Sequence, residues 1–599
     1  MGESLPTKKA KPPQLAIAST ICLVWLMTMG IIATIWNLGE IGLVDETEPL
    51  FAEAARQMTV TGDWITPYFN GETRFDKPPL IYWAIALCYQ AIGVNPWAVR
   101  LPSALAAIFL GWFGFYTLRR FGGSPGQTQP FAIAGCIGGT AIVMNVQTIA
   151  WARMGVSDML LSAGIGSALL AFFFAYATPE RQAKQRWYQA FYAFCALAVL
   201  TKGPVGIVLP GLIIVCFLAY MGNLKLVLGE MNLKGGVLLF FALTLPWYIL
   251  VTWANGWDYI NSFFGYHNIE RFTSVVNNHS APWYFYIPTI FVGFFPWSVY
   301  LPIALFKTRF WQRRAWLRQP RSQHLRIFAF FWFICIFGFF TIAVTKLPSY
   351  VLPLMPACGI LVALVWSEPE AGNSKRFNPG LFWSGVANII LCLALATFAP
   401  FATPALGNDP AMPNLGTTLQ ELGFLLQFTG HYTILAIVLF IALLGKWWRG
   451  LWTVNAIAFA AFMIFIVTPM TEIVDQQRQL PLRELAQTVT QTQQPSEPLV
   501  MIGFWKPSLT FYTENTFIYG HHSQQSLVTL GNLIQDPETP ETLLILGELK
   551  NFTSMEFEPQ QYEVLDQQGV YQLVRISKEE VINTLNKNIQ KASILMHKS

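Results

Sequence analysis

Residues 44–83 read VDETEPLFAEAARQMTVTGDWITPYFNGETRFDKPPLIYW, and this polar segment connects apolar stretches on both sides. It carries ten charged side chains: Asp45, Glu46, Glu48, Glu53, Arg56, Asp63, Glu72, Arg74, Asp76 and Lys77. Because the chain is mostly apolar, this concentration of charge in one connecting segment marks a candidate reaction site. Within the segment, Asn70-Gly71 predicts a tight turn.

A short helix is expected to begin near Pro49, after the acidic turn, because proline suits the first turn of a helix. Its pattern favours a position on the membrane surface, with Glu53 and Arg56 in water. The side that faces the membrane would consist of Leu50, Phe51 and Ala54.

The composition is typical of a polytopic membrane protein. Of the 599 residues, 54% are hydrophobic and 12% are charged, whereas an ordinary soluble chain has about 25% charged residues. The net charge of +5 requires no nucleic-acid partner, because lysine and arginine gather in short loops, where membrane orientation explains them. The eight cysteines form no CxxC motif and no His-Cys cluster, so neither a disulfide framework nor a thiolate metal site is indicated.

Runs of roughly 20 apolar residues predict transmembrane helices. About thirteen such runs occur, at residues 15–36, 97–118, 130–149, 159–177, 188–200, 204–221, 236–254, 284–306, 327–344, 350–366, 381–402, 431–445 and 451–469. The first run is too long for a signal peptide, and it follows Lys8, Lys9 and Lys11. We therefore expect a retained first span with a cytoplasmic N-terminus, an orientation that also puts the other basic loops in the cytoplasm.

From about residue 471 the sequence becomes rich in Gln, Glu and Pro. This change divides the chain into a membrane domain, 1–470, and a soluble extracytoplasmic domain, 471–599. The second domain is predicted to be a small α/β domain, with a helix at 482–490 and strands at 499–504, 542–547 and 570–576. Its sequence contains no glycine loop of the kind that binds nucleotide phosphates.

The outer boundary is expected to carry four cations, against the positive-inside trend: Lys77, Lys202, Arg271 and Lys346. A phosphate or diphosphate at the membrane surface would satisfy such a group, since arginine offers a planar fork and lysine a point charge. Snorkelling toward lipid headgroups would explain a single lysine equally well, so both interpretations stay open.

Two acidic residues, Asp45 and Glu46, follow the first span. A partly dry cleft there would raise the basicity of a carboxylate and suit it to catalysis. The pair would serve equally as a solvated cap of the short helix, since acids favour helix N-termini. At another span end, Arg153 and Asp158 either pair with each other or contact a substrate.

Seven motifs follow one another along the membrane part: VDETEPLFAEAA, GDWITPYFNGETRFDKPPLIYW, VRLPSALAA, WARMGVSD, LTKGPVG, YHNIERF and TKLPSYVLPLMPA. As an ordered set they resemble the integral-membrane glycosyltransferases that use polyprenyl-phosphate sugars, most closely the aminoarabinose transferase and protein mannosyltransferase group. The resemblance covers about residues 15–470. It implies a GT-C fold of about thirteen transmembrane helices in the bacterial inner membrane, with a periplasmic C-terminal domain.

The resemblance also implies the chemistry, which is transfer with inversion from an undecaprenyl-phosphate-linked sugar to a lipid A-like or other envelope acceptor. Asp45 would be the catalytic acid, with Glu46 beside it. The donor phosphate would be bound by Lys77, Arg271, Lys346, Tyr350 and Lys202. A divalent metal would be held by Asp76 and His267, although a glutamate is expected at the position of Asp76.

Three other functions stay open. A protein O-mannosyltransferase-like enzyme would differ in using a polypeptide acceptor. A transporter or flippase of a lipid-linked sugar would carry ionisable residues near the middle of the membrane, whereas here they lie at span ends on one side. A non-catalytic assembly protein would be indifferent to the substitution Asp45→Asn.

Overall fold

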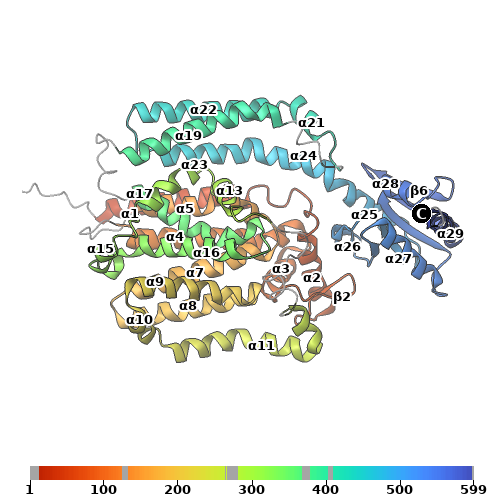
Figure 1. Ribbon diagram of the computed structural model, residues 1–599, viewed down its shortest axis with the longest axis horizontal. Coiled ribbons are helices and arrows are strands. Elements are labelled where there is room, and N and C mark those ends of the chain that lie inside the picture. Colours follow the sequence, from red (N-terminus) through yellow and green to blue (C-terminus); the bar gives the residue numbers. More distant parts are fainter. Residues whose placement is uncertain are drawn as a thin grey trace, which may run out of the picture.

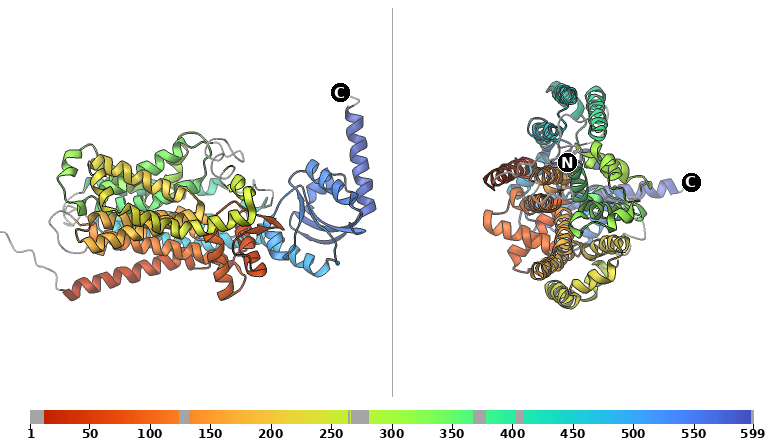
Figure 2. Two further views of the ribbon diagram at one scale, coloured as in Figure 1. Left: turned by 90° about the horizontal axis from the view of Figure 1, so that it is seen from below. Right: turned by 90° about the vertical axis from the view of Figure 1, so that its left-hand side faces the viewer.

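The computed structural model describes residues 12–123, 132–263, 265, 281–366, 378–402, 409 and 411–596. Its helices form an elongated bundle, and a small sheet domain is attached to one end of that bundle (Figure 1). The N-terminal helix lies along one edge of the bundle, and the last helix projects away from the sheet domain (Figure 2).

Each predicted apolar segment coincides with one helix or with a bent helix pair. The bundle consists of α1 (Pro12–Gly30), α4 (Pro96–Phe121), α5 (Ala132–Val143), α6 (Val146–Ala152), α7 (Ser157–Ala177), α8 (Arg181–Lys202), α9 (Val205–Met221), α11 (Leu233–Ile260), α13 (Tyr286–Gly293), α14 (Leu301–Phe306), α16 (Leu325–Ile342), α17 (Met355–Trp366), α19 (Pro379–Phe398), α22 (Phe424–Leu444), α23 (Leu451–Phe462) and α24 (Thr468–Arg478). Among the described residues, eight helices are long and apolar enough to cross a membrane, or ten if two bent pairs each count as one span. The multi-pass helical architecture is confirmed, whereas the count of thirteen spans is not.

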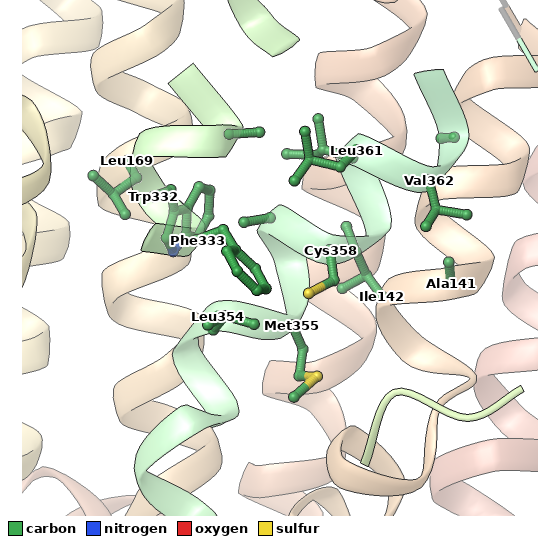
Figure 3. Packing of buried hydrophobic residues seen from close by; sticks show 14 of the residues in the cluster. Ala141, Ile142, Leu169, Trp332, Phe333, Leu354, Met355, Cys358, Leu361 and Val362 are labelled. Atoms are coloured by element: carbon green, nitrogen blue, oxygen red, sulfur yellow. The ribbon is translucent and has the colours of Figure 1, made fainter. Parts of the chain in front are cut away.

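The centre of the bundle is a close-packed apolar core. Helices α7 and α17 are buried along most of their length. Figure 3 shows Met355 and Cys358 of α17 between Ile142 of α5 and Phe333 of α16. At the periphery, α11 is mostly exposed and presents Trp253 at 84% exposure, which suits a helix that faces lipid.

The polar segment after α1 forms helices and a small hairpin at one end of the bundle. Its elements are α2 (Glu48–Thr61), β1 (Tyr68–Phe69), β2 (Glu72–Thr73) and α3 (Leu80–Ile92). The predicted turn between the strands is confirmed, because Asn70 and Gly71 have φ of 54° and 81°, the left-handed pair that a tight hairpin requires.

Helix α2 is buried inside the protein, so the predicted position on the membrane surface is wrong. Glu53 and Arg56 are buried as well, and they pair across 2.7 Å instead of facing water. The helix packs against α3 and against α26 (Pro507–Thr513) of the C-terminal domain. An amphipathic pattern looks the same whether its apolar face meets lipid or another domain, which explains the error. The apolar side chains predicted to face lipid are buried: Leu50, Phe51 and Ala54.

The C-terminal domain is built on a five-stranded sheet with the order β4-β3-β5-β7-β6. Its strands are β3 (Leu499–Ile502), β4 (Ile518–Gly520), β5 (Thr542–Glu548), β6 (Tyr562–Gln568) and β7 (Tyr571–Ser577), and its helices are α25 (Leu480–Thr492), α26, α27 (Ser523–Gln535), α28 (Leu549–Ser554) and α29 (Lys578–Met596). Strand β3 runs parallel to β4 and β5, whereas β7 is antiparallel to β5 and β6. The three predicted strands and the predicted helix are confirmed. Helix α24 continues past residue 470, the predicted domain boundary, to Arg478.

Candidate active site

Loops that are far apart in the sequence meet at the end of the bundle that carries the C-terminal domain (Figure 1). The Glu48 carboxylate accepts a 2.7 Å hydrogen bond from the backbone N–H of Gly155, in the turn between α6 and α7. On α11, Asn255 donates a 2.9 Å hydrogen bond to Thr66 Oγ1. These contacts bring the first loop together with the turn before α7 and with α11.

Asp45 lies where the first loop contacts the C-terminal domain. The residue is half-buried, and its Oδ1 accepts a 3.0 Å hydrogen bond from the backbone N–H of Ser508. Its Oδ2 accepts a second hydrogen bond from Ser508 Oγ. Burial raises the pKa of Asp45 to about 6, although the hydrogen bonds from Ser508 and the charge of Lys506 lower it. A carboxyl group that titrates in this range can exchange a proton near neutral pH.

Glu46 is held much less firmly than Asp45. Its side chain is 55% exposed and lies 3.6 Å from Lys506 Nζ, which is a loose surface ion pair of small energetic value. Glu46 does not cap α2, because the N-cap of that helix is Thr47, which makes no side-chain capping bond. A catalytic role for Glu46 stays a prediction.

Arg100 on α4 fixes the chain just before Asp45. Its Nε and Nη2 each form a 2.8 Å bond with the Glu48 carboxylate, and both side chains are fully buried. Its guanidinium also donates to the backbone carbonyls of Leu38, Ile41 and Gly42. This planar fork thus ties α2 and the preceding chain to α4. Sequence reasoning missed Arg100, although an arginine inside a predicted span was a signal for it.

Arg153 holds the chain immediately before the residues that Arg100 binds. Its guanidinium donates to the carbonyls of Trp36 at 2.7 Å and Asn37 at 3.1 Å. The ion pair between Arg153 and Asp158 that the sequence left open is not formed, because Asp158 pairs with Lys202.

Lys77 is buried and pairs with the residue before it. Its Nζ lies 2.6 Å from Asp76 Oδ1, and Arg74 Nη2 lies 3.0 Å from Asp76 Oδ2. Both carboxylate oxygens of Asp76 thus accept from cationic groups, and metal binding by Asp76 stays a prediction. The described part of the chain also contains no group of three His, Cys, Asp or Glu side chains that would hold a metal. His267, the other predicted ligand, lies outside the described residues.

A second group of charges surrounds Asp158 at the start of α7. Lys202 Nζ lies 2.8 Å from Asp158 Oδ1 and 5.9 Å from the centre of the Tyr350 ring. Asp158 also interacts with the charge of Lys77 and with the side chain of Ser349. Lys202 therefore lies between Asp158 and Tyr350, and the charge of Lys77 also acts on Asp158.

The two remaining predicted phosphate ligands are Lys346 and Arg271. Lys346 is buried, and its Nζ donates a 2.7 Å hydrogen bond to Ala343 O in the loop that leads to Tyr350. Arg271 lies outside the described residues.

Two family descriptions match parts of the chain. Residues 76–250 match the family Dolichyl-phosphate-mannose-protein mannosyltransferase, and residues 492–593 match Cyanobacterial RgtA-type glycosyltransferase, C-terminal domain. An undecaprenyl phosphate-alpha-4-amino-4-deoxy-L-arabinose arabinosyl transferase from Pseudomonas paraeruginosa is 28% identical over 62% of this chain and 64% of its own length. Its counterpart from Shewanella sediminis is 30% identical over 54% and 56%. The chain thus spans less than two thirds of the length of these relatives.

The same fold occurs in a solved structure, that of ArnT from Cupriavidus metallidurans bound to undecaprenyl phosphate. The TM-score is 0.72 at 22% sequence identity, and the match covers 95% of this chain and 98% of that one. The likeness extends over both the helical bundle and the C-terminal domain. In its fold, its domain matches and its relatives, the chain is similar to the GT-C group of the aminoarabinose transferases and protein mannosyltransferases.

Proposed function

We propose that the protein is an inverting glycosyltransferase that moves a sugar from undecaprenyl phosphate to a lipid A-like or other cell-envelope acceptor. The observation that carries the proposal is a firmly held carboxylate, Asp45, at the same end of the membrane bundle as Lys77, Lys202 and Tyr350. A donor phosphate would lie against this cation group, and Arg271 would complete it. The relatives' donor, a sugar on undecaprenyl phosphate, has the chemistry that such a group recognises.

The arrangement suits transfer from a phosphate leaving group. As the bond between the anomeric carbon and the phosphate oxygen breaks, negative charge grows on the phosphate, and fixed cations stabilise that charge in the transition state. A hydroxyl acceptor would attack the anomeric carbon from the face opposite the leaving phosphate, and this attack inverts the anomeric centre. The hydroxyl would give its proton to Asp45. A phosphate acceptor is already ionised, so Asp45 would then position it or stabilise positive charge on the sugar.

The proposal puts the site and the C-terminal domain on the periplasmic side of the bacterial inner membrane. The opposite end of the bundle supports this orientation, because Lys184 and Arg321 gather there around Glu230, and cytoplasmic loops are the ones rich in basic residues. The N-terminus would lie in the cytoplasm. The proposed division into a membrane domain and a soluble domain falls near residue 470.

A polypeptide acceptor is the second candidate, because residues 76–250 match the protein mannosyltransferase family. The two candidates share the donor and the site and differ only in the acceptor. A transporter is less favoured, since the ionisable groups of the described site lie at helix ends rather than on helices broken in mid-membrane.

Transfer of radiolabelled sugar from a panel of undecaprenyl-phosphate donors to total envelope extract tests the proposal with the purified full-length protein. We expect Asp45→Asn and Lys77→Ala each to lower the transfer rate by about 10²-fold or more. The matched controls are Asp536→Asn and Lys225→Ala, which change exposed residues distant from the site and should transfer at the wild-type rate.

The labelled product identifies the acceptor, because lipid and protein separate on extraction. The proposal is refuted if the wild type consumes no donor, or if the wild type and both site variants transfer sugar at equal rates. A transport assay would then be the next step.

A further inference from the structure

The C-terminal domain reaches Asp45 through the first turn of α26. There Ser508 is completely buried, and Lys506, the residue just before the helix, faces Glu46. Ser508 offers Asp45 two donors at once, its backbone N–H to Oδ1 and its hydroxyl to Oδ2. A residue 463 positions away in the sequence thus provides hydrogen bonds to both oxygens of the carboxylate.

Two-point attachment matters for a carboxylate because rotation about its last side-chain bond is otherwise broad and weakly restrained. Donors on both oxygens fix the plane of the group. They leave further lone pairs on each oxygen to accept a proton or a substrate hydrogen bond. Hydrogen bonds to the charged form also favour it, which opposes the effect of burial.

Contacts at the C-terminal end of α26 hold this helix against the first loop and α2. Tyr512 Oη accepts a 2.9 Å hydrogen bond from the backbone N–H of Leu43, two residues before Asp45. Arg56 of α2 pairs with Glu514, just after α26, at 3.1 Å. The first loop and the segment around α26 therefore form one unit, and the position of Ser508 relative to Asp45 is fixed by that unit.

We propose that Ser508 is a positioning residue for Asp45, so that the C-terminal domain supplies part of the active site rather than serving only as an accessory domain. Its hydroxyl holds the carboxylate in one orientation and in its charged form. The inference rests on the proposed function in one respect, that Asp45 is the carboxylate used in transfer.

The test compares Ser508→Ala with Ser508→Thr, which keeps the hydroxyl, and with Ser526→Ala as the matched control. Ser526 is an equally buried serine of the same domain with two hydrogen bonds, and its partners are Gly503 and Gly520 rather than Asp45. Two readouts are taken on the full-length protein. One is the pH profile of sugar transfer, and the other is an infrared titration of the Asp45 carboxyl band, identified by its loss in Asp45→Asn.

We expect Ser508→Ala to move the acid limb of the transfer profile and the infrared midpoint of Asp45 upward by about one pH unit. Ser508→Thr should restore both toward wild type, and Ser526→Ala should move neither. The inference is overturned if Ser508→Ala leaves the infrared midpoint in place, or if Ser526→Ala shifts it equally. The infrared titration needs no turnover, so it tests the effect of Ser508 on Asp45 even if the wild type transfers no sugar. Absence of transfer by the wild type would refute the proposed function alone.

Discussion

The ionisation of Asp45 depends on two opposing features of its surroundings. Burial raises its pKa to about 6, and the donors from Ser508 limit that rise. In the proposed reaction Asp45 works as a carboxylate, so we expect kcat/KM to fall as the pH drops below about 6, where the group becomes protonated. The measurement is kcat/KM for sugar transfer over a pH series. A rate that stays level to well below pH 6 in folded protein would contradict it.

The same raised pKa has a consequence for stability. The folded protein binds the proton of Asp45 more tightly than the unfolded chain, whose value is near 3.8. Folding free energy is therefore lost as the pH rises from about 4 to about 6 and the buried group ionises. Asn carries no charge, so at neutral pH Asp45→Asn should unfold at the wild-type temperature or above while transferring about 10²-fold less sugar. Thermal unfolding in detergent checks this, and a clear drop in Tm would count against it.

Helices α2 and α4 are joined by one buried ion pair, that of Glu48 with Arg100. Removing one partner leaves a buried charge unpaired, which costs about 3–5 kcal/mol, whereas removing both costs less. We therefore expect Arg100→Met to destabilise the protein more than the double variant Arg100→Met with Glu48→Gln, because the amide oxygen introduced by Glu48→Gln can still accept from Gly155. Unfolding midpoints of the four proteins in this cycle give the answer. Equal losses in the single and double variants would show that the pair does not join these helices.

Secondary structure here could be predicted because its causes are local. Asn70 and Gly71 form their turn from their own backbone preferences, and the strand at 499–504 follows from a short run of β-branched and apolar residues. The same holds for the apolar helices, whose number as membrane spans still depends on bends that composition does not reveal. Topology predicts that the ends of these helices lie on one side of the membrane, but the pairing of Lys202 with Asp158 appears only in the structure.

The parts that could not be predicted depend on distant partners. Helix α2 packs against α26, which is far away in the sequence. The sequence of its apolar face does not show whether lipid or another part of the protein covers it. Ser508 has no local feature that distinguishes it from other serines. The predicted metal ligand His267 lies outside the described residues, so the metal prediction is untested. The ion pairs of Asp76 with Arg74 and Lys77 appear only in the three-dimensional structure.

At the scale of the whole molecule, the hairpin of the first loop is fastened to the C-terminal domain. The side chain of Asn70 donates to Phe517 O at 2.9 Å and accepts from Phe517 N–H at 2.7 Å. We expect Asn70→Ala to loosen this joint, which speeds hydrogen exchange in β4 and lowers transfer several-fold, because Ser508 then holds Asp45 less firmly. Mass-spectrometric hydrogen exchange measures the first effect. Asn515→Ala removes a bond within the C-terminal domain itself and is the control that should leave transfer unchanged.

The distance along the chain between Asp45 and Ser508, 463 residues, also sets the order of events during biosynthesis. Asp45 is synthesised before its partner, and the membrane helices that lie between them in the sequence are made first. Contacts between such distant residues form late in folding, because the intervening chain must first be ordered. A nascent or truncated chain that stops before Ser508 therefore has the carboxylate but not its support. If the proposed function holds, a chain that terminates before this domain should be an inert membrane protein rather than an unregulated transferase.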